Sequence, residues 1–183
     1  MYGNSAPHSA GSMTVRRSTA NMGTASAVFT STPRSAILDI AVRLFGQQGY
    51  SGTSMRDIAK AFGVLPGSLY AHIDSKETLL VEIVDTGIEH FLEAVEPIAA
   101  AKGAAAMRMR EAIRAHIIVV TENPERSLVV FHQWRFLGDP YRDAAIAKRR
   151  RYEQAFVRIL QDGIAEGSFD PGLNVRIAVL TVL

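Results

Sequence analysis

From Pro33 onwards, apolar residues recur every three or four positions, which is the spacing of one face of an amphipathic helix. The first such stretch ends at Gly49, a residue suited to the position that follows a helix. Its apolar face consists of Ile37, Ile40, Ala41, Leu44 and Phe45. The pattern therefore predicts a first helix that begins near Pro33 and ends just before Gly49.

A second helix is predicted to begin after Ser54. Ser54 and Asp57 have the spacing of a capping box, in which the two residues satisfy backbone donors at the start of a helix. Gly63 follows the apolar residues Ile58 and Phe62 at the place where a left-handed residue ends a helix. The predicted helix is short, with one apolar face.

A third short helix is predicted to begin at Pro66, which needs no N–H hydrogen bond in a first turn. Leu69 and Ile73 then point inward. The outward residues are Ser68, Tyr70 and His72. A buried helix, a glycine turn and a short helix with an exposed polar face are typical of a DNA-binding helix-turn-helix, whose second helix enters the major groove.

Five more helices are predicted in the rest of the chain. Ser75 can cap a long fourth helix that continues to Pro97, and a fifth runs from about residue 104 to 121. Its apolar stripe contains Met107, Ile113, His116, Ile117 and Val120. Three Asx-Pro pairs then predict the starts of a sixth, seventh and eighth helix, at Asn123-Pro124, Asp139-Pro140 and Asp170-Pro171. Gly138 and Gly167 predict stops, no strand pattern competes, and the expected fold class is all-α.

Composition and charge refine this picture. Residues 1–32 are rich in Ser, Thr, Ala and Gly and predict a disordered tail; its Arg16 and Arg17 either follow DNA phosphates or belong to an inert segment. The net charge of +2 is weak evidence for nucleic-acid binding, but no acidic residue precedes Asp39, so the N-terminal end is locally basic. The chain has no cysteine and no apolar run long enough to cross a membrane, and we expect a cytoplasmic protein.

The segment GSLYAHIDSKETLL, preceded by TSMRDIAKAFGV, resembles the DNA-binding domain of the TetR family of bacterial transcriptional repressors. The resemblance implies a three-helix DNA-binding domain over residues 33–76. A helical domain that binds an effector and forms a homodimer would follow over residues 77–183. The chain stops inside the apolar run IAVLTVL, where family members usually complete a dimer-forming bundle, so the resemblance also implies a missing final helix.

The resemblance implies DNA contacts at particular positions of this chain. Arg56 would reach a phosphate or a base edge, the hydroxyl of Thr53 or Ser54 would bind a phosphate, and Lys76 would act as a phosphate clamp. The remaining implied contacts come from the second helix of the motif: Pro66, Gly67, Ser68, Tyr70 and His72.

The body offers aromatic and polar residues on helices expected to surround a common interior: Phe91, His116, Phe131, Trp134, Arg135 and Tyr152. Such a mixture lines a ligand pocket, and it also occurs in an ordinary core. The segments FHQWRFL and RRRYEQAFVRIL resemble regulators of lipid or steroid catabolism, which implies an acyl-CoA or lipid-like effector. The run Lys148 to Arg151 would either neutralise a CoA phosphate or form a solvated helix face.

The sequence therefore predicts a repressor that binds a palindromic operator in double-stranded DNA as a homodimer and is released by a small molecule. The alternative is a helical carrier or enzyme whose helix-turn-helix serves only packing. We expect no enzymatic activity, no cofactor and no metal, because His116 and His132 lack metal-ligand spacing and no nucleophile lies near an identifiable base in sequence.

Overall fold

The computed structural model describes residues 32–183, which fold entirely into helices and turns. The helices are α1 (Pro33–Gln48), α2 (Met55–Phe62), α3 (Pro66–Leu69), α4 (Lys76–Ala100), α5 (Ala105–Glu122), α6 (Pro124–His132), the 3-10 turn η1 (Trp134–Phe136), α7 (Tyr141–Ala165) and α8 (Val175–Val182). The predicted all-α fold is confirmed. The interpretation of residues 1–31 as a disordered tail with Arg16 and Arg17 lies outside the described residues.

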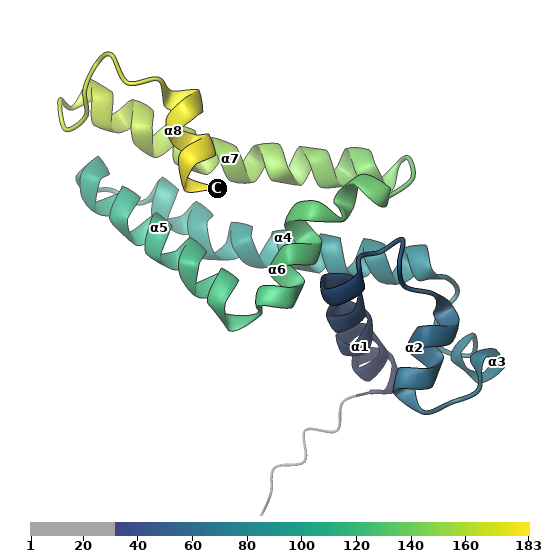
Figure 1. Ribbon diagram of the computed structural model, residues 1–183. Coiled ribbons are helices and arrows are strands. Elements are labelled where there is room, and N and C mark those ends of the chain that lie inside the picture. Colours follow the sequence, from purple (N-terminus) through teal and green to yellow (C-terminus); the bar gives the residue numbers. More distant parts are fainter. Residues whose placement is uncertain (1–31) are drawn as a thin grey trace, which may run out of the picture. The chain divides into compact units, whose positions relative to one another are not determined.

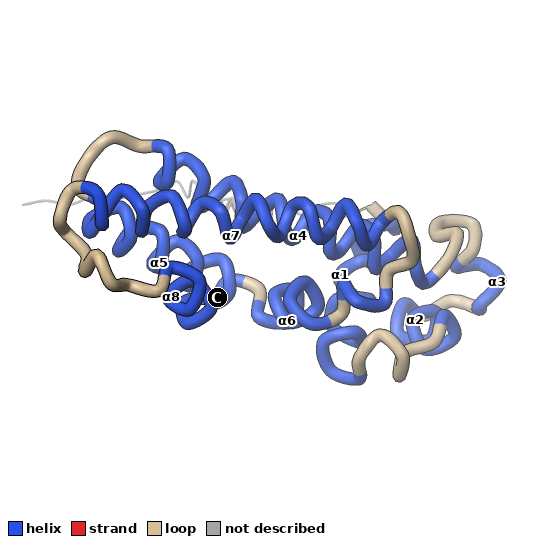
Figure 2. The backbone as a smooth tube through the Cα atoms, turned by 90° about the horizontal axis from the view of Figure 1, so that it is seen from above, coloured by secondary structure: helices blue, strands red, loops and turns tan. Residues whose placement is uncertain are grey.

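The two longest helices, α4 and α7, lie side by side and form the centre of the body (Figures 1 and 2). Helix α5 packs against both of them, and α6 packs against α4 and α1. Helices α1, α2 and α3 gather around the first part of α4, while α8 lies near the opposite end of α7 (Figure 1). One helix, α4, thus connects the helix-turn-helix with the body.

Buried apolar side chains are continuous from the three-helix part into the body. Phe45, Ile58, Leu69 and Leu79 are fully buried at one end, and Phe156 is fully buried in the body. Residues 32–183 belong to one compact unit. The boundary between two functional domains at residue 76 therefore stays a prediction.

The predicted helix starts are correct where the capping side chain can reach the first turn. Thr78 N donates to Ser75 Oγ at 3.0 Å at the start of α4, and Arg126 N donates to Asn123 Oδ1 at 2.9 Å at the start of α6. Gly49 and Gly167 end α1 and α7 with positive φ angles of 76° and 78°. These contacts satisfy backbone groups that have no partner within the helix.

Two Asx-Pro pairs do not cap helices, contrary to the prediction. Asp139 pairs instead with Arg142, at 2.6 Å from carboxylate oxygen to guanidinium nitrogen, and Pro140 itself precedes α7. Asp170 Oδ1 accepts a hydrogen bond from Gly172 N at 2.7 Å in a tight turn. Helix α8 begins later, where Asn174 Oδ1 accepts from Ile177 N at 3.1 Å. Asp139 thus binds a side chain of the first turn of α7 and not its backbone, and Asp170 binds the backbone of the turn before α8.

Three further helix predictions were wrong in part. The fourth helix was predicted to end at Pro97, but Pro97 lies inside α4, which continues to Ala100. The predicted sixth helix ends at His132, and Trp134–Phe136 form the separate turn η1. Met107 and Ile117, expected in the buried stripe of α5, are about half exposed, whereas Ala112 and His116 are buried.

Within residues 32–183, no helix combines the length and apolarity that crossing a bilayer requires.

Candidate nucleic-acid interface and ligand cavity

The helix-turn-helix is held in shape by its own capping contacts. Asp57 N donates to Ser54 Oγ at 3.2 Å, and Ser54 N donates to Asp57 Oδ2 at 2.9 Å, so the predicted capping box is present. The Ser54 hydroxyl also donates to Asp57 Oδ2, and this hydrogen bond together with that from Ser54 N holds the pKa of Asp57 below its ordinary value. Gly63 adopts a left-handed conformation with φ of 84°, which turns the chain towards α3.

The exposed face of α3 and the turn after it carries the polar residues that the sequence singled out. Leu69 is fully buried and Ile73 is 1% exposed, so these two anchor the segment to the core. Tyr70 is 53% exposed. The other exposed candidates are Ser54, Arg56, Pro66, Gly67, Ser68 and His72. The structure therefore brings a phenol, an imidazole, a hydroxyl and a guanidinium group to one end of the molecule.

Thr53 has no part in this exposed surface. It is 1% exposed, and its hydroxyl donates to the carbonyl oxygens of Gly49 at 3.0 Å and Leu44 at 3.3 Å. Those carbonyl oxygens belong to the end of α1, where backbone acceptors need partners. Thr53 closes the end of α1, and its expected phosphate contact is corrected.

Lys76 is also used within the protein. Its ammonium donates to the carbonyl oxygens of Tyr50 at 2.9 Å and Thr53 at 2.8 Å, and lies 4.1 Å from the centre of the Tyr50 ring. These contacts tie the start of α4 to the loop between α1 and α2. The phosphate clamp at Lys76 stays a prediction, because an ammonium group has three donors and the two hydrogen bonds use only two of them.

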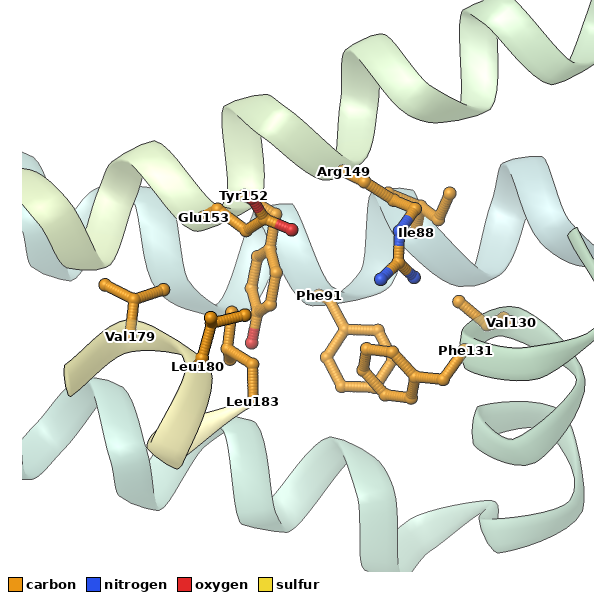
Figure 3. Close-up of a pocket in the computed structure, with 10 residues that line it drawn as sticks. All are labelled: Ile88, Phe91, Val130, Phe131, Arg149, Tyr152, Glu153, Val179, Leu180 and Leu183. Atoms are coloured by element: carbon orange, nitrogen blue, oxygen red, sulfur yellow. The ribbon is translucent and has the colours of Figure 1, made fainter. Parts of the chain in front are cut away.

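A cavity of about 190 Å³ lies in the body between α4, α6, α7 and α8 (Figure 3). Its walls are mostly apolar and aromatic, and its ionisable groups come from α7. The lining residues are Ile88, Phe91, Val130, Phe131, Arg149, Tyr152, Glu153, Val179, Leu180 and Leu183. Apolar walls with a few polar groups are the usual composition of a small-molecule site.

Three of the predicted ligand residues line this cavity, and a fourth supports it. Phe91, Phe131 and Tyr152 are wall residues. His116 lies behind them, with its Nδ1 2.8 Å from the Tyr152 hydroxyl oxygen. Burial lowers the pKa of His116 and raises that of Tyr152, so both groups are held neutral.

The remaining two predicted residues differ in their outcome. The Trp134 ring lies 5.3 Å from the guanidinium carbon of Arg149, so Trp134 contacts a wall residue without lining the cavity itself. Arg135 is exposed on η1 and does not line the cavity. Its expected ligand contact is corrected, because the 3-10 turn directs neighbouring residues to different sides.

The basic run from Lys148 to Arg151 divides into separate environments. Lys148 pairs with Asp85 at 2.6 Å and with Glu89 at 2.7 Å, and Arg151 pairs with Glu96. Arg149 is half-buried and points into the cavity (Figure 3). The run is thus neither wholly solvated nor wholly available to one ligand.

A larger hollow of about 540 Å³ lies between α4, α5 and the start of α6. Most of its lining is charged or polar, including Asp85, Glu89, Glu93 and Glu122. That composition disfavours an acyl or aromatic ligand, so the smaller cavity is the better candidate. Within residues 32–183, no group of three His, Asp or Glu side chains is placed to hold a metal ion.

Two family models match separate stretches of the chain. The model described as bacterial regulatory proteins, tetR family, matches residues 37–83, and the one described as tetracyclin repressor-like, C-terminal domain, matches residues 102–183. The crystal structure of the TetR family transcriptional regulator PfmR from Thermus thermophilus is 30% identical, with a TM-score of 0.74, and the match covers 83% of this chain and 81% of PfmR. This chain belongs to the TetR family.

Other TetR relatives are similar over most of their length. The HTH-type transcriptional repressor KstR2 of Mycolicibacterium smegmatis is 27% identical over 143 residues, which cover 78% of this chain and 70% of KstR2. The crystal structure of AibR in complex with isovaleryl coenzyme A and operator DNA is 27% identical, with a TM-score of 0.74, and the match covers 82% of each chain. PfmR and KstR2 are transcriptional regulators by name, and AibR binds operator DNA in its crystal structure.

Two residues of this TetR protein have roles that the sequence did not reveal. Tyr50 receives Lys76 and stacks on Phe136, with ring centres 5.6 Å apart, yet it stands in a glycine-rich loop without periodicity. Arg149 lies within a basic run, where nothing distinguishes it from its neighbours. The sequence signal that could have identified Arg149 is its helical spacing: it precedes Tyr152, already a ligand candidate, by three positions and therefore shares its face of α7.

Proposed function

We propose that this TetR protein is a transcriptional repressor whose affinity for operator DNA changes when a small molecule occupies the cavity. The carrying observation is the exposed polar face formed by Ser68, Tyr70 and His72 above the buried anchors Leu69 and Ile73. A helix-turn-helix that served only packing would not need to expose a tyrosine there. Membership in a family of transcriptional regulators supports the same proposal.

In this proposal α3 and the following turn enter the major groove, with Gly67 allowing a close approach of the backbone. A Cβ added at Gly67 would meet no other atom within 4 Å, which supports a role outside the protein core. Arg56, exposed on α2, contacts a phosphate or a base edge. Ser54 lies at the exposed start of α2, and its hydroxyl would have to exchange its hydrogen bond to the Asp57 carboxylate for one to a phosphate.

The proposed effector is an acyl-CoA or a lipid-like molecule whose apolar part enters the cavity. The aromatic walls formed by Phe91, Phe131 and Tyr152 support an apolar ligand, and the AibR structure contains isovaleryl coenzyme A. A cavity of about 190 Å³ suits only the acyl end of such a molecule. An apolar cavity of about 150 Å³ is already large enough for benzene.

Signal transmission in this proposal uses two connections between the cavity and the DNA-binding part. Helix α4 contributes Phe91 to the cavity and begins at Lys76, which holds the loop between α1 and α2. The second connection is η1, since Trp134 contacts Arg149 while Phe136 stacks on Tyr50. A ligand with different affinities for two arrangements of these elements would change the affinity for DNA.

We further propose that two copies act together on a palindromic operator, with half-sites about one helical turn or more apart. The test is selection of bound sequences from random and genomic DNA, with and without candidate acyl-CoA ligands. We expect an enriched palindrome from the wild-type protein and none from Tyr70→Ala. A monomer that binds single half-sites as tightly as the palindrome would contradict this part, and absence of any enriched sequence would favour the helical carrier or enzyme.

A further inference from the structure

Arg149 is a cation held inside an apolar cavity without an acidic partner among residues 32–183. Its guanidinium carbon lies 5.3 Å from the centre of the Trp134 ring and 5.7 Å from that of Phe131. No carboxylate of the described residues lies within ion-pair distance of it, although Lys148 and Arg151 are both paired with acids on α4. Arg149 therefore has no ion pair at the cavity wall, and the carboxylate of Glu153, one turn further along α7, offsets its charge only from a longer distance.

The two aromatic rings stabilise the charge of Arg149 but cannot replace oxygen acceptors. A guanidinium group has five N–H donors arranged in a fork that matches a carboxylate or a phosphate. None of these donors forms a hydrogen bond with residues 32–183. Because no side-chain nitrogen that lacks a partner is buried in this part of the chain, the donors are accessible, and Arg149 lines the cavity. Burial lowers the pKa of Arg149, but a guanidinium remains charged at any physiological pH.

The two ends of the cavity differ in charge. Arg149 points towards Phe91 and Phe131 at the α6 end, whereas Glu153 lies beside Tyr152 nearer to α8 (Figure 3). Val179, Leu180 and Leu183 line the α8 end. An anionic group would be attracted to the α6 end and repelled from the Glu153 end, which leaves the apolar walls for the rest of the molecule.

We propose that Arg149 binds an anionic oxygen group of a ligand whose apolar body fills the cavity. This inference rests on the proposed function only in using the same cavity, and it adds the charge of the ligand and the residue that recognises it. The anionic group is either the carboxylate of a small free acid or a phosphate of a longer acyl-CoA. Both present oxygen atoms that accept paired N–H donors.

The test is calorimetric titration of the full chain with matched probes. Octanoate and 3-phenylpropionate are compared with octanamide and 3-phenylpropionamide, and octanoyl-CoA is compared with CoA. The variants are Arg149→Gln, which removes the charge, Arg149→Lys, which keeps it without the fork, and the control Arg150→Gln, which removes a neighbouring exposed charge from the same helix.

For the wild type and Arg150→Gln we expect each acid to bind about 10- to 100-fold more tightly than its amide, the factor of a charge-assisted contact. Arg149→Gln should abolish this preference, and Arg149→Lys should keep only part of it. If the anionic group is instead a CoA phosphate, octanoyl-CoA should bind about 10- to 100-fold more weakly to Arg149→Gln than to the wild type, while each acid binds like its amide.

Equal binding of acid and amide by the wild type together with an unchanged octanoyl-CoA affinity in Arg149→Gln would overturn the assignment. So would an acid preference that persists in Arg149→Gln, or failure of every anionic probe to bind. Circular dichroism of Arg149→Gln checks that a lost preference does not reflect unfolding. Failure of the DNA selection would contradict the proposed repressor function but not the role of Arg149, because the titration contains no DNA. In that case an intact anion preference would describe a small-molecule carrier.

Discussion

The ammonium group of Lys76 lies 4.1 Å from the centre of the Tyr50 ring and donates to the Tyr50 carbonyl oxygen at 2.9 Å. A second hydrogen bond of 2.8 Å reaches the Thr53 carbonyl oxygen. The first residue of α4 thereby fixes the loop that precedes α2, the first helix of the helix-turn-helix. This arrangement makes Lys76 a positioning residue, with consequences for both stability and DNA affinity.

Replacing Lys76 with Met should lower the free energy of unfolding by about 2 kcal/mol, because charged hydrogen bonds contribute more than neutral ones. DNA affinity should fall, while the slope of log affinity against log salt should stay close to that of the wild type. Urea unfolding and titrations at several salt concentrations measure the two effects, with the exposed Lys102→Met as control. If Lys76→Met is as stable as the wild type and its salt slope is reduced, Lys76 is a phosphate contact and not a positioning residue.

Arg56 should behave in the opposite way, because it is exposed on α2 and forms no ion pair within residues 32–183. Arg56→Ala should leave the unfolding free energy nearly unchanged. If Arg56 contacts a phosphate, the salt slope should become less negative by about 0.9. The control Arg114→Ala removes an exposed charge from α5 in the body. An unchanged slope together with altered sequence preference would indicate a base contact.

The positions of the helices could be predicted where a local contact decides them. The capping box of Ser54 and Asp57 and the left-handed Gly63 depend on neighbours within a few residues, and the structure has all three as expected. Asp139 and Asp170 had the same local pattern as Asn123, but each formed a closer contact, with Arg142 and Gly172. Sequence spacing cannot choose between two nearby partners.

The candidate sites were harder to predict because they depend on distant parts of the chain. Lys76 meets Tyr50 across 26 positions, and His116 meets Tyr152 across 36. Exposure of Tyr70 followed from its helix face, since Leu69 next to it is apolar. Nothing local distinguished Arg149 from Arg150, because a rotation of about 100° from one residue to the next on α7 separates the cavity wall from solvent.

His116 should make the protein less stable as the pH falls. Burial lowers its pKa in the folded state below the ordinary value of 6.5, so the unfolded chain binds this proton at a higher pH than the folded chain. The stabilising contribution of neutral His116 is fully present above about pH 6.5, the pKa in the unfolded chain. It decreases as the pH falls from there towards the lower pKa of the folded state. Urea unfolding between pH 8 and about pH 5 measures the decrease.

The control for His116 is the exposed His90 on α4. His116→Gln should flatten the pH dependence in that window, whereas His90→Gln should follow the wild type. If both variants keep the full acid-induced loss, His116 is not its source. His116→Gln also weakens the contact with Tyr152, so its stability at pH 8 should already be lower.

Gly87 marks a close contact between α4 and α6. A Cβ at this position would lie 2.3 Å from Val130 Cγ2, well inside the distance that two carbon atoms tolerate. Gly87→Ala should therefore destabilise the protein by about 1–3 kcal/mol through overpacking. Removing the obstructing methyl groups in Gly87→Ala/Val130→Ala should recover part of the loss relative to Val130→Ala alone. Thermal unfolding of the four proteins tests this, and additive losses would contradict it.

The 3-10 turn η1 should transmit ligand binding to the DNA-binding part. Trp134 contacts Arg149 at the cavity, while Phe136 stacks on Tyr50 and Gln133 Oε1 accepts a hydrogen bond from Tyr50 N at 3.1 Å. Phe136→Ala should leave the affinity for a cavity-binding carboxylate or CoA ester unchanged. The ratio of DNA dissociation constants with and without that ligand should shrink by about 2- to 30-fold, the range found for residues that modulate coupling between sites.

DNA titrations with and without a saturating anionic ligand measure this ratio, using an operator obtained by selection. Tyr141→Ala is the matched control, because Tyr141 is a half-exposed aromatic residue just beyond η1 at the start of α7. The control should keep the wild-type ratio. Equal ratios in Phe136→Ala and the wild type would leave α4 as the remaining route, since it alone of the two connections joins Lys76 to Phe91 within one helix.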